Sequence, residues 1–403
     1  MTILIGIVGK PSSGKSTFLN AACLTEAETS IIPFTTIDPN KGVSYVRTQC
    51  VCKELGVEDN PKNSICKNGI RFIPVNLLDV AGLVPDAHKG KGLGNKFLND
   101  LSRADVLIHI VDITGSLDSN GQRIGVGKTD PLNDIKFLEK EINLWFKEIL
   151  EREDWEKFKR TFKKQRTKFI NGLFDRLSGL KIKKIHIKLA LRKSQLNSRD
   201  PIDWDQTDLL KFTTELRKIA KPIVVIANKI DKISDPMKLK GLQEKYNGVI
   251  IPSSALAELY LRKYEEQKRI KYLPGSGDFQ FLKEESFSKN ELTMLKKIKN
   301  EILKKYGGTG VQSALNYAVF EIMKQICVFP VSNVNNYSDK NGNVLPDAFL
   351  IEEGLKLRNF VEKKIHSDLA KNFLFGIDAR TKKRLGENYE LKDKDIIKIV
   401  TSN

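Results

Sequence analysis

The chain has 403 residues, 40% of them hydrophobic, which is enough for two or three domains with hydrophobic cores. No run approaches the roughly 18 apolar residues of a membrane-spanning helix, and the first predicted strand begins at Ile3. We therefore expect neither a membrane span nor a signal peptide. Five cysteines, an odd number, favour a reducing cytoplasm over a disulfide framework. Most of the net charge of +18 lies in one segment, residues 157–193.

The first predicted strand leads into a phosphate-binding loop. Residues 3–8 form an apolar run, residues 9–16 match G-x-x-x-x-G-K-[ST], and a helix is predicted behind them. Lys15 would reach the β- and γ-phosphates, and Ser16 would bind Mg²⁺. The predicted nucleotide contacts of this loop are Gly9, Pro11, Ser12, Ser13, Gly14, Lys15, Ser16 and Thr17. The alternative is a glycine-rich turn without a ligand, but strand, loop and helix in this order favour the nucleotide.

A candidate switch threonine and a candidate metal-binding aspartate follow. Residues 32–40 hold two adjacent threonines, Thr35 and Thr36, and one of them would reach Mg²⁺ and the γ-phosphate. The spacing does not choose between them, and a threonine in a β-rich loop is the alternative. Residues 79–82 match D-x-x-G after an apolar run. Asp79 would meet Mg²⁺ through water, and the Gly82 N–H would sense the γ-phosphate.

Two later motifs indicate which base is bound. Residues 228–231 match N-K-x-D at the end of a predicted strand, with the candidate contacts Asn228, Lys229 and Asp231. A carboxylate at Asp231 accepts two hydrogen bonds from guanine, whereas adenine offers no such donor pair. Ser254 and Ala255 fit a further guanine motif, with the Ala255 N–H facing guanine O6. An ordinary polar turn is the alternative. The motifs together predict a GTP site.

A basic helical insert is predicted between the strand at residues 106–111 and the strand beginning at Pro222. Its apolar and aromatic residues keep helical spacing, so we expect this stripe to be core rather than a base-stacking platform. Residues 157–193 carry fourteen Lys and Arg against one acid, Asp175. Clustered basic residues favour contact with RNA phosphates, and a solvated surface is the alternative.

The C-terminal part reads as helices followed by a small β-rich module. Helices are predicted at residues 256–271, 283–306 and 311–325. Short strands at 327–331, 348–351 and 396–400, with a helix at 357–365, predict a β-grasp module. Its 13 basic and 11 acidic residues in 326–403 do not by themselves indicate RNA binding.

Three cysteines raise the question of a metal. Cys50, Cys52 and Cys66 would make a partial site, but zinc prefers four ligands in tighter pairs. This spacing favours thiols without a metal.

Four segments together resemble the Obg-like, YchF-related GTPases, and most of all their archaeal branch, in which N-K-x-D is intact. They are the phosphate-binding loop, Pro-Phe-Thr-Thr-Ile-Asp-Pro-Asn at 33–40, Asp-Val-Ala-Gly-Leu-Val at 79–84, and the glycine-rich residues 90–98. The resemblance covers nearly the whole chain. It implies an α/β Ras-like GTPase domain at 1–130 and 209–323, a basic helical hairpin inserted at 131–208, and a TGS β-grasp domain at 324–403. It also implies that Thr36 is the Mg²⁺ ligand.

Two departures from the family pattern bear on hydrolysis. Ser12 replaces the Asn that helps to hold potassium in relatives, which puts potassium stimulation in doubt. Leu83 stands where Ras-type enzymes carry the water-orienting Gln, and residues 124–128 lack the His of bacterial-type relatives. His88 is the nearest imidazole in sequence and a candidate catalytic group, with a solvated surface residue as the alternative.

Two functions follow from the resemblance. One is a slow GTPase that acts as a switch on the ribosome or RNA, with the hairpin and the TGS domain as effectors. The alternative is a nucleotide-gated RNA- or ribosome-binding module with negligible intrinsic hydrolysis.

Overall fold

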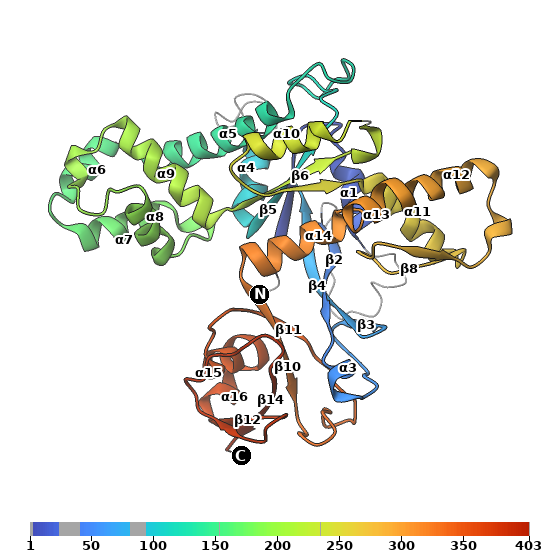
Figure 1. Ribbon diagram of the computed structural model, residues 1–403. Coiled ribbons are helices and arrows are strands. Elements are labelled where there is room, and N and C mark those ends of the chain that lie inside the picture. The colour runs from blue at the N-terminus through green and yellow to red at the C-terminus, as the bar shows by residue number, and fades with distance from the viewer. Residues whose placement is uncertain (1–2, 24–40, 81–93, 153, 234, 403) are drawn as a thin grey trace. The chain divides into compact units, whose positions relative to one another are not determined.

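The computed structural model describes residues 3–23, 41–80, 94–152, 154–233 and 235–402 (Figure 1). Thr35, Thr36, Gly82, Leu83 and His88 lie outside these ranges. The chain forms two compact units. One comprises residues 1–3, 22–76 and 315–403, and the other comprises residues 4–21 and 77–314. Among the helices of the described ranges, none is long and apolar enough to cross a membrane.

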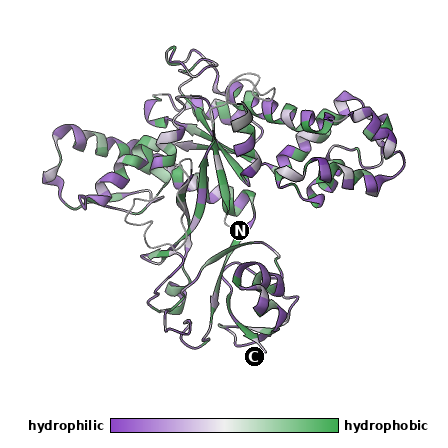
Figure 2. Ribbon diagram, turned by 180° about the vertical axis from the view of Figure 1, so that it is seen from behind, coloured by the Kyte–Doolittle hydropathy of each residue, from purple (hydrophilic) through white to green (hydrophobic). Residues whose placement is uncertain are grey.

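The larger unit is built on a parallel sheet with the order β1 (Leu4–Val8), β5 (Val106–Asp112), β6 (Ile223–Asn228) and β7 (Ile250–Ser253). The last residues of β4 (Ile70–Asp79) continue the sheet beside β1, where the Val80 N–H donates to the Ile7 carbonyl at 3.1 Å. The central strands are almost completely buried, and Figure 2 shows them as hydrophobic. Parallel strands covered on both faces require such continuous apolar runs.

Helices and short strands surround this sheet. They are α1 (Lys15–Ala22), α4 (Gly94–Arg103), η4 (Ile230–Lys232), α10 (Met237–Lys245), α11 (Ala255–Glu266), β8 (Ile270–Tyr272), β9 (Phe279–Phe281), η5 (Glu284–Ser286), α12 (Lys289–Lys297), η6 (Ile298–Leu303) and α13 (Lys304–Tyr306). The chain continues into α14 (Val311–Asn316) and η7 (Tyr317–Ile322).

The predicted helix over 256–271 is too long at its C-terminal end. The helix α11 ends at Glu266, and Ile270 to Tyr272 instead pair with β9. Ile270 and Tyr272 are buried while Lys271 is exposed, a two-residue period that fits a strand and not a helix. Tertiary pairing with Phe279–Phe281 therefore overrides the local helical pattern.

The insert is helical, as predicted, but it contains more than two helices. Its helices are α5 (Pro131–Glu151), α6 (Trp155–Thr161), α7 (Arg166–Arg176), η2 (Ser178–Leu180), α8 (Lys184–Lys193), η3 (Pro201–Asp203) and α9 (Gln206–Ala220). The long helices α5 and α9 pack on each other. The helices α6, α7 and α8 lie between them in sequence and form the outer part of the insert (Figure 1). α9 extends beyond residue 208 because its apolar side chains Leu209, Phe212 and Leu216 are buried in the insert core.

The aromatic stripe of the insert is core, as predicted. Trp155 and Phe169 retain 5% and 2% exposure, and Phe158 and Phe162 pack against the same cluster. Neighbouring rings lie between 4.8 and 6.4 Å apart, which is the range of favourable aromatic pairs. These rings are therefore not available as a stacking platform.

The smaller unit holds an antiparallel segment and a β-grasp module. Its first part contains β2 (Lys41–Gln49), α3 (Cys52–Leu55), β3 (Ile65–Lys67) and the first residues of β4, with β3 antiparallel to β4. The C-terminal sheet has the order β11 (Phe349–Glu352), β10 (Gln325–Val331), β14 (Ile396–Thr401), β12 (Phe373–Asp378) and β13 (Arg384–Leu385). The helices α15 (Leu357–Phe360), η8 (Val361–Ile365) and α16 (Ser367–Lys371) complete it. The β-grasp prediction is confirmed, and β12 and β13 are additional strands.

Candidate nucleotide-binding site

The predicted nucleotide residues that the structure describes meet at one edge of the parallel sheet. The phosphate-binding loop follows β1, and Asp79, Asp112, Asn228 and Ser253 are the last residues of β4, β5, β6 and β7. Asp112 is opposite Asn228 in the ladder, and Asn228 is opposite Ser253. Ligands of open α/β sheets bind at this carboxyl edge. The sheet register therefore brings motifs together that are more than 200 residues apart in sequence.

Two glycines of the phosphate-binding loop are required by the backbone. Gly9 has φ of +148°, and a Cβ atom there would lie 2.4 Å from the Ile110 carbonyl oxygen. Gly14 has φ of +104°, and a Cβ atom there would lie 2.3 Å from Asn228 Nδ2. Any side chain at either position would push the loop away from the strands beneath it. The loop therefore keeps its close approach to β5 and β6 only with glycine.

The loop positions Lys15 next to Asp79. Lys15 Nζ and Ser13 Oγ both donate to the Lys10 carbonyl oxygen, each at 2.9 Å. The pKa of Lys15 is lowered from its usual value because the side chain is buried, and the negative charge of Asp79 opposes this shift. Ser16 is exposed in the first turn of α1. The hydroxyl and carboxylate oxygens of Ser16 and Asp79 are the hard donors that Mg²⁺ prefers, so these residues fit a magnesium ion.

Asn228 connects the phosphate-binding loop to the last strand. Its Nδ2 donates to the Ser13 carbonyl oxygen at 3.0 Å, and its Oδ1 accepts from the Ala255 N–H at 3.1 Å. Asn228 is buried and both ends of its amide are used. The Ala255 N–H, predicted to face guanine O6, is thus bonded to Asn228 in this structure. Its contact with the base stays a prediction.

Lys229 is held by a residue that the sequence analysis did not single out. Lys229 has φ of +68°, and its Nζ lies 2.9 Å from Asp112 Oδ2 and 2.8 Å from the Ser12 carbonyl oxygen. Although burial would raise the pKa of Asp112, hydrogen bonds from Thr114, Ser116 and Lys229 hold it below its usual value. The sequence could have indicated Asp112 as a site residue, because it is an acidic residue directly after the apolar run of β5.

Asp231 is oriented by Ser254. Ser254 Oγ donates to Asp231 Oδ1 at 2.6 Å and accepts from the Ala257 N–H at 3.2 Å, so it also caps α11. Asp231 is partly exposed and lines a pocket together with Leu256 and Tyr260. The hydrogen bond from Ser254 therefore fixes one oxygen of this partly exposed carboxylate, while the other lining residues of the pocket come from α11, α12 and η6.

Two further groups lie under or beside the phosphate-binding loop. His109 of β5 retains 2% exposure, and burial, followed by the charges of Lys15 and Lys10, lowers its pKa to about 3. The imidazole is therefore neutral at physiological pH. Lys10 Nζ lies 2.5 Å from Asp134 Oδ1 of α5, which joins the loop to the helical insert. His109, Lys10 and Asp134 are not among the residues predicted for the site.

Comparison with protein-family models covers most of the chain. Residues 4–148 match the model described as 50S ribosome-binding GTPase, and residues 226–333 match Obg-like GTPase YGR210-like, G4 motif-containing domain. Residues 360–401 match the TGS domain. These matches confirm the predicted α/β P-loop GTPase domain and the C-terminal TGS domain.

Relatives of known sequence or structure match this chain over most of their length. The chain is 44% identical over 400 residues to an uncharacterized GTP-binding protein of Methanocaldococcus jannaschii, with 99% of each protein covered. It is 38% identical to an uncharacterized GTP-binding protein of Schizosaccharomyces pombe, with 87% of each covered. The crystal structure of a GTP-binding protein from Pyrococcus horikoshii superimposes with a TM-score of 0.78 at 39% identity, covering 99% of this chain and 100% of that one.

Proposed function

The chain belongs to the Obg-like, YchF-related family of GTPases, and on this premise we propose that it is a nucleotide-dependent switch that binds RNA or the ribosome. It is a GTP-binding protein and a P-loop nucleotide hydrolase. The RNA- or ribosome-binding role is carried by one observation, a dense basic surface on the helical insert. The insert is part of the same compact unit as the nucleotide site.

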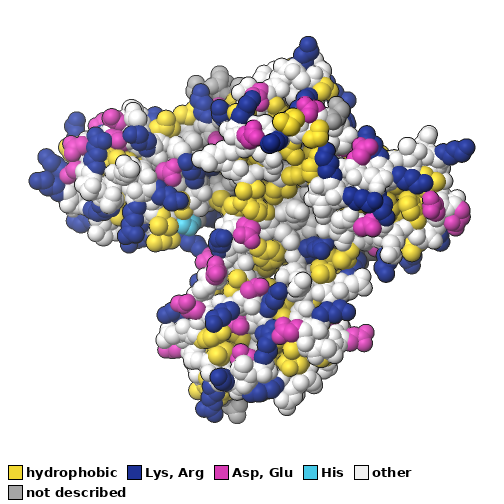
Figure 3. All heavy atoms as spheres, viewed as in Figure 1, with side chains coloured by type: hydrophobic (Ala, Val, Ile, Leu, Met, Phe, Trp, Pro, Cys, Tyr) yellow, Lys and Arg dark blue, Asp and Glu magenta, His cyan; other side chains and the backbone are white. Residues whose placement is uncertain are grey.

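The basic surface is formed by exposed side chains. Twelve of the fourteen Lys and Arg of residues 157–193 are exposed, and they come from α6, α7, α8 and their connections. Figure 3 shows many Lys and Arg side chains on the visible face of the insert, at the left of the view, with a smaller number of acidic side chains among them. Phosphates of any sequence would bind such a surface, because clustered cations release the counterions of the nucleic acid.

The two remaining basic residues have structural roles. Lys159 is buried, where its Nζ donates to the Trp204 carbonyl oxygen at 2.8 Å. Arg176 is partly buried and stacks on the Phe158 ring, with 4.0 Å between its guanidinium carbon and the ring centroid. Both residues hold the insert together, so variants that test RNA binding should avoid them.

From the chemistry of GTP and Mg²⁺ we expect the following roles for the residues of the site. Lys15 would bind the β- and γ-phosphates, with Ser16, Asp79 and Thr36 as the ligands of Mg²⁺. Mg²⁺ would neutralise charge on the phosphates during hydrolysis. Asp231 would accept the guanine N1–H and N2 amine, with Ser254 fixing its orientation. Gly82 and His88 stay candidates for sensing the γ-phosphate and for catalysis.

A GTPase that hydrolyses GTP without a partner needs a group that orients the attacking water. Leu83 can neither donate nor accept a hydrogen bond, and His109 lies buried in the sheet. We therefore infer slow hydrolysis without a partner. The alternative function, a nucleotide-gated RNA- or ribosome-binding module with negligible intrinsic hydrolysis, is favoured by the same leucine.

Three further observations support a ribosomal or RNA partner and a cytoplasmic location. The family model over residues 4–148 is described as a ribosome-binding GTPase, and the C-terminal module is a TGS domain. The odd number of cysteines, five, favours a reducing cytoplasm.

Charge reversal on the insert tests the proposal. The variant Lys163→Glu/Lys164→Glu/Arg166→Glu changes three exposed residues at the α6–α7 connection. The matched control Lys263→Glu/Lys271→Glu/Lys289→Glu changes three exposed lysines outside the insert. RNA and ribosome binding should be measured over a range of salt concentrations with a GTP analogue and with GDP.

We expect the insert variant to bind at least about tenfold more weakly and with a flatter salt dependence, because it loses phosphate contacts. GTP binding by the isolated protein should stay unchanged. If the insert variant and the control lose the same affinity for RNA and ribosomes, the loss reflects net charge and not the insert surface. If neither variant loses affinity, the proposal is wrong. Single-turnover hydrolysis with and without ribosomes separates the slow GTPase from the non-hydrolysing module.

A further inference from the structure

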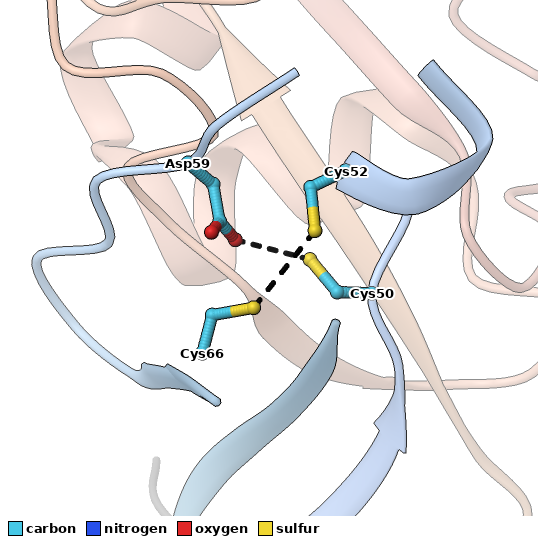
Figure 4. Close-up of side chains that lie close together, drawn as sticks. All are labelled: Cys50, Cys52, Asp59 and Cys66. Atoms are coloured by element: carbon cyan, nitrogen blue, oxygen red, sulfur yellow. Dashed lines mark hydrogen bonds between the residues drawn. The ribbon is translucent and has the colours of Figure 1, made fainter. Parts of the chain in front are cut away.

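Three thiols and one carboxylate of the smaller unit converge on a common centre, outside the nucleotide site. Cys50 follows β2, Cys52 begins α3, Asp59 lies in the loop after α3, and Cys66 belongs to β3. Their four side chains point toward one another (Figure 4). One ligand atom from each lies within 4.8 Å of all the others. The spacing of the cysteines alone favours thiols without a metal, but the fold supplies a fourth ligand that the spacing does not reveal.

The distances in this cluster fit a single tetrahedral ion. With Zn–S bonds of about 2.3 Å, two thiolate ligands of a tetrahedral zinc lie about 3.8 Å apart. Cys52 Sγ and Cys66 Sγ are 3.9 Å apart. A thiolate and a carboxylate oxygen on the same ion would lie about 3.5 Å apart, and Cys50 Sγ and Asp59 Oδ2 are 3.2 Å apart. Small movements of these side chains would complete the coordination sphere.

A buried arginine provides the second layer of this cluster. Arg71 of β4 is completely buried, and its guanidinium donates to Cys50 Sγ at 3.3 and 3.4 Å and to Asp59 Oδ2 at 2.8 Å. Three thiolates and one carboxylate carry a charge of −4, which Zn²⁺ and Arg71 together reduce to −1. Buried charge requires such compensation, and N–H donors to the ligand atoms are typical of metal sites.

We propose that Cys50, Cys52, Asp59 and Cys66 bind one structural Zn²⁺ ion. Each thiol would release its proton to solvent on binding. Mixed sulfur and oxygen donors in a tetrahedral set select zinc over magnesium or calcium, which prefer oxygen alone. A polynuclear iron–sulfur cluster would hold the four ligand atoms farther apart, because several metal and sulfide atoms would separate them. Four protein ligands leave no open position, so the site is structural and not catalytic.

The ion would fix a loop that contacts the C-terminal module. In the loop that carries Asp59, the Asn60 N–H donates to the Val344 carbonyl oxygen at 2.9 Å, and the Lys62 N–H donates to the Pro346 carbonyl oxygen at 2.6 Å. Arg71 itself donates to the Leu345 carbonyl oxygen at 3.2 Å. Zinc would therefore stabilise the packing of this loop on residues 344–346, all within the smaller unit.

Metal analysis of the full chain tests this proposal. The protein, purified with Zn²⁺ and then freed of loosely bound metal, should contain one zinc per chain by elemental mass spectrometry. Co²⁺ substitution should give a thiolate-to-metal charge-transfer band and tetrahedral d–d bands. Cys52→Ser, Cys66→Ser and Asp59→Asn should each lower the zinc content, with Asp59→Asn having the smallest effect. Cys23→Ser, at the residue directly after α1 and outside the cluster, should retain the full zinc content.

Other results would overturn the proposal. A wild-type chain that takes up neither Zn²⁺ nor Co²⁺ would leave only a hydrogen-bonded thiol cluster. A disulfide between Cys52 and Cys66, found by alkylation and mass spectrometry in the purified chain, would identify a redox pair instead. Because the spectrum is recorded on the wild type, the test stands even where a variant fails to fold. Its outcome is independent of GTP hydrolysis and RNA binding.

Discussion

Asp112 holds Lys229 through a 2.9 Å ion pair, and the same ammonium donates to the Ser12 carbonyl oxygen of the phosphate-binding loop. The carboxylate retains 1% side-chain exposure and receives hydrogen bonds from both the Thr114 and Ser116 hydroxyls. The lysine of N-K-x-D thus joins β5, β6 and the phosphate-binding loop.

We expect Asp112→Asn to weaken GTP and GDP binding by about 10- to 100-fold, since a hydrogen bond to a charged group contributes about 1.5–3 kcal/mol. The amide keeps the shape of the side chain but loses the charge that fixes Lys229. Titration calorimetry with both nucleotides measures the change. Asp175→Asn, an exposed aspartate of the insert, is the control. Unchanged affinity in Asp112→Asn would show that Lys229 is positioned by Ser12 alone.

Base selectivity should depend on Asp231. The variant Asp231→Asn should lose at least about 100-fold in GTP affinity and gain affinity for xanthosine nucleotides, because the amide donates where the xanthine O2 accepts. Ser254→Ala removes the 2.6 Å hydrogen bond to this carboxylate and should lower GTP affinity by several-fold without changing the preferred base. Fluorescent-nucleotide competition compares the three proteins. Equal affinity of the wild type for ATP and GTP would contradict the guanine assignment.

The local parts of the nucleotide site could be predicted from the sequence. The strand, the loop and the helix of residues 3–22 are adjacent in the chain, so their geometry follows from one segment. The pairing of Asp112 with Lys229 depends instead on the register of β5 against β6, which no local pattern contains. The hydrogen bonds of Asn228 to Ser13 and Ala255 could not be predicted for the same reason, because they join segments that are distant in sequence.

The cysteine cluster shows a second limit of sequence reasoning. Cys50, Cys52 and Cys66 were evident, but Asp59 is one acid among 50 and stands at no characteristic spacing from them. The convergence depends on Arg71, whose burial and hydrogen bonds draw Cys50 and Asp59 together. A buried arginine in a strand is not distinguished by the sequence from the exposed arginines of the chain.

His109 should make the folded state sensitive to acid. Its pKa is lowered to about 3 in the folded chain, by burial and then by Lys15 and Lys10, and is about 6.5 when unfolded. Between these values the unfolded chain binds the proton and the folded chain does not, so stability falls as the pH is lowered below about 6.5. The loss attributable to this group is about 3 kcal/mol at pH 4.

The variant His109→Leu should remove this part of the pH dependence. Among the residues that the structure describes, His109 Nδ1 has no hydrogen-bond partner, so an apolar replacement breaks no described hydrogen bond at this atom. Thermal unfolding between pH 7 and 4 should give a flatter profile for His109→Leu than for the wild type. His366→Asn, which changes an exposed histidine of the C-terminal module, should keep the wild-type slope. Parallel slopes in all three proteins would show that His109 is not the acid-sensitive group.

The ion pair between Lys10 and Asp134 is a direct link between the phosphate-binding loop and the insert. Lys15 donates to the Lys10 carbonyl oxygen, so a γ-phosphate that draws Lys15 away would change the surroundings of Lys10. Lys10 in turn holds Asp134 at 2.5 Å in the first turn of α5, the helix that leads to the basic surface. If nucleotide state governs RNA binding, this contact is one direct route between the two sites within the described part of the chain.

We therefore expect Asp134→Ala to reduce the difference in RNA affinity between the GTP-analogue and GDP states, while the average affinity changes little. The basic residues that meet RNA are untouched by this substitution. Glu151→Gln, at the other end of α5, is the control and should retain the difference. The charge swap Lys10→Asp/Asp134→Lys should restore part of it, since the pair is re-formed with opposite polarity. If Asp134→Ala keeps the full nucleotide dependence, the signal does not pass through this ion pair, because no other change separates that variant from the wild type.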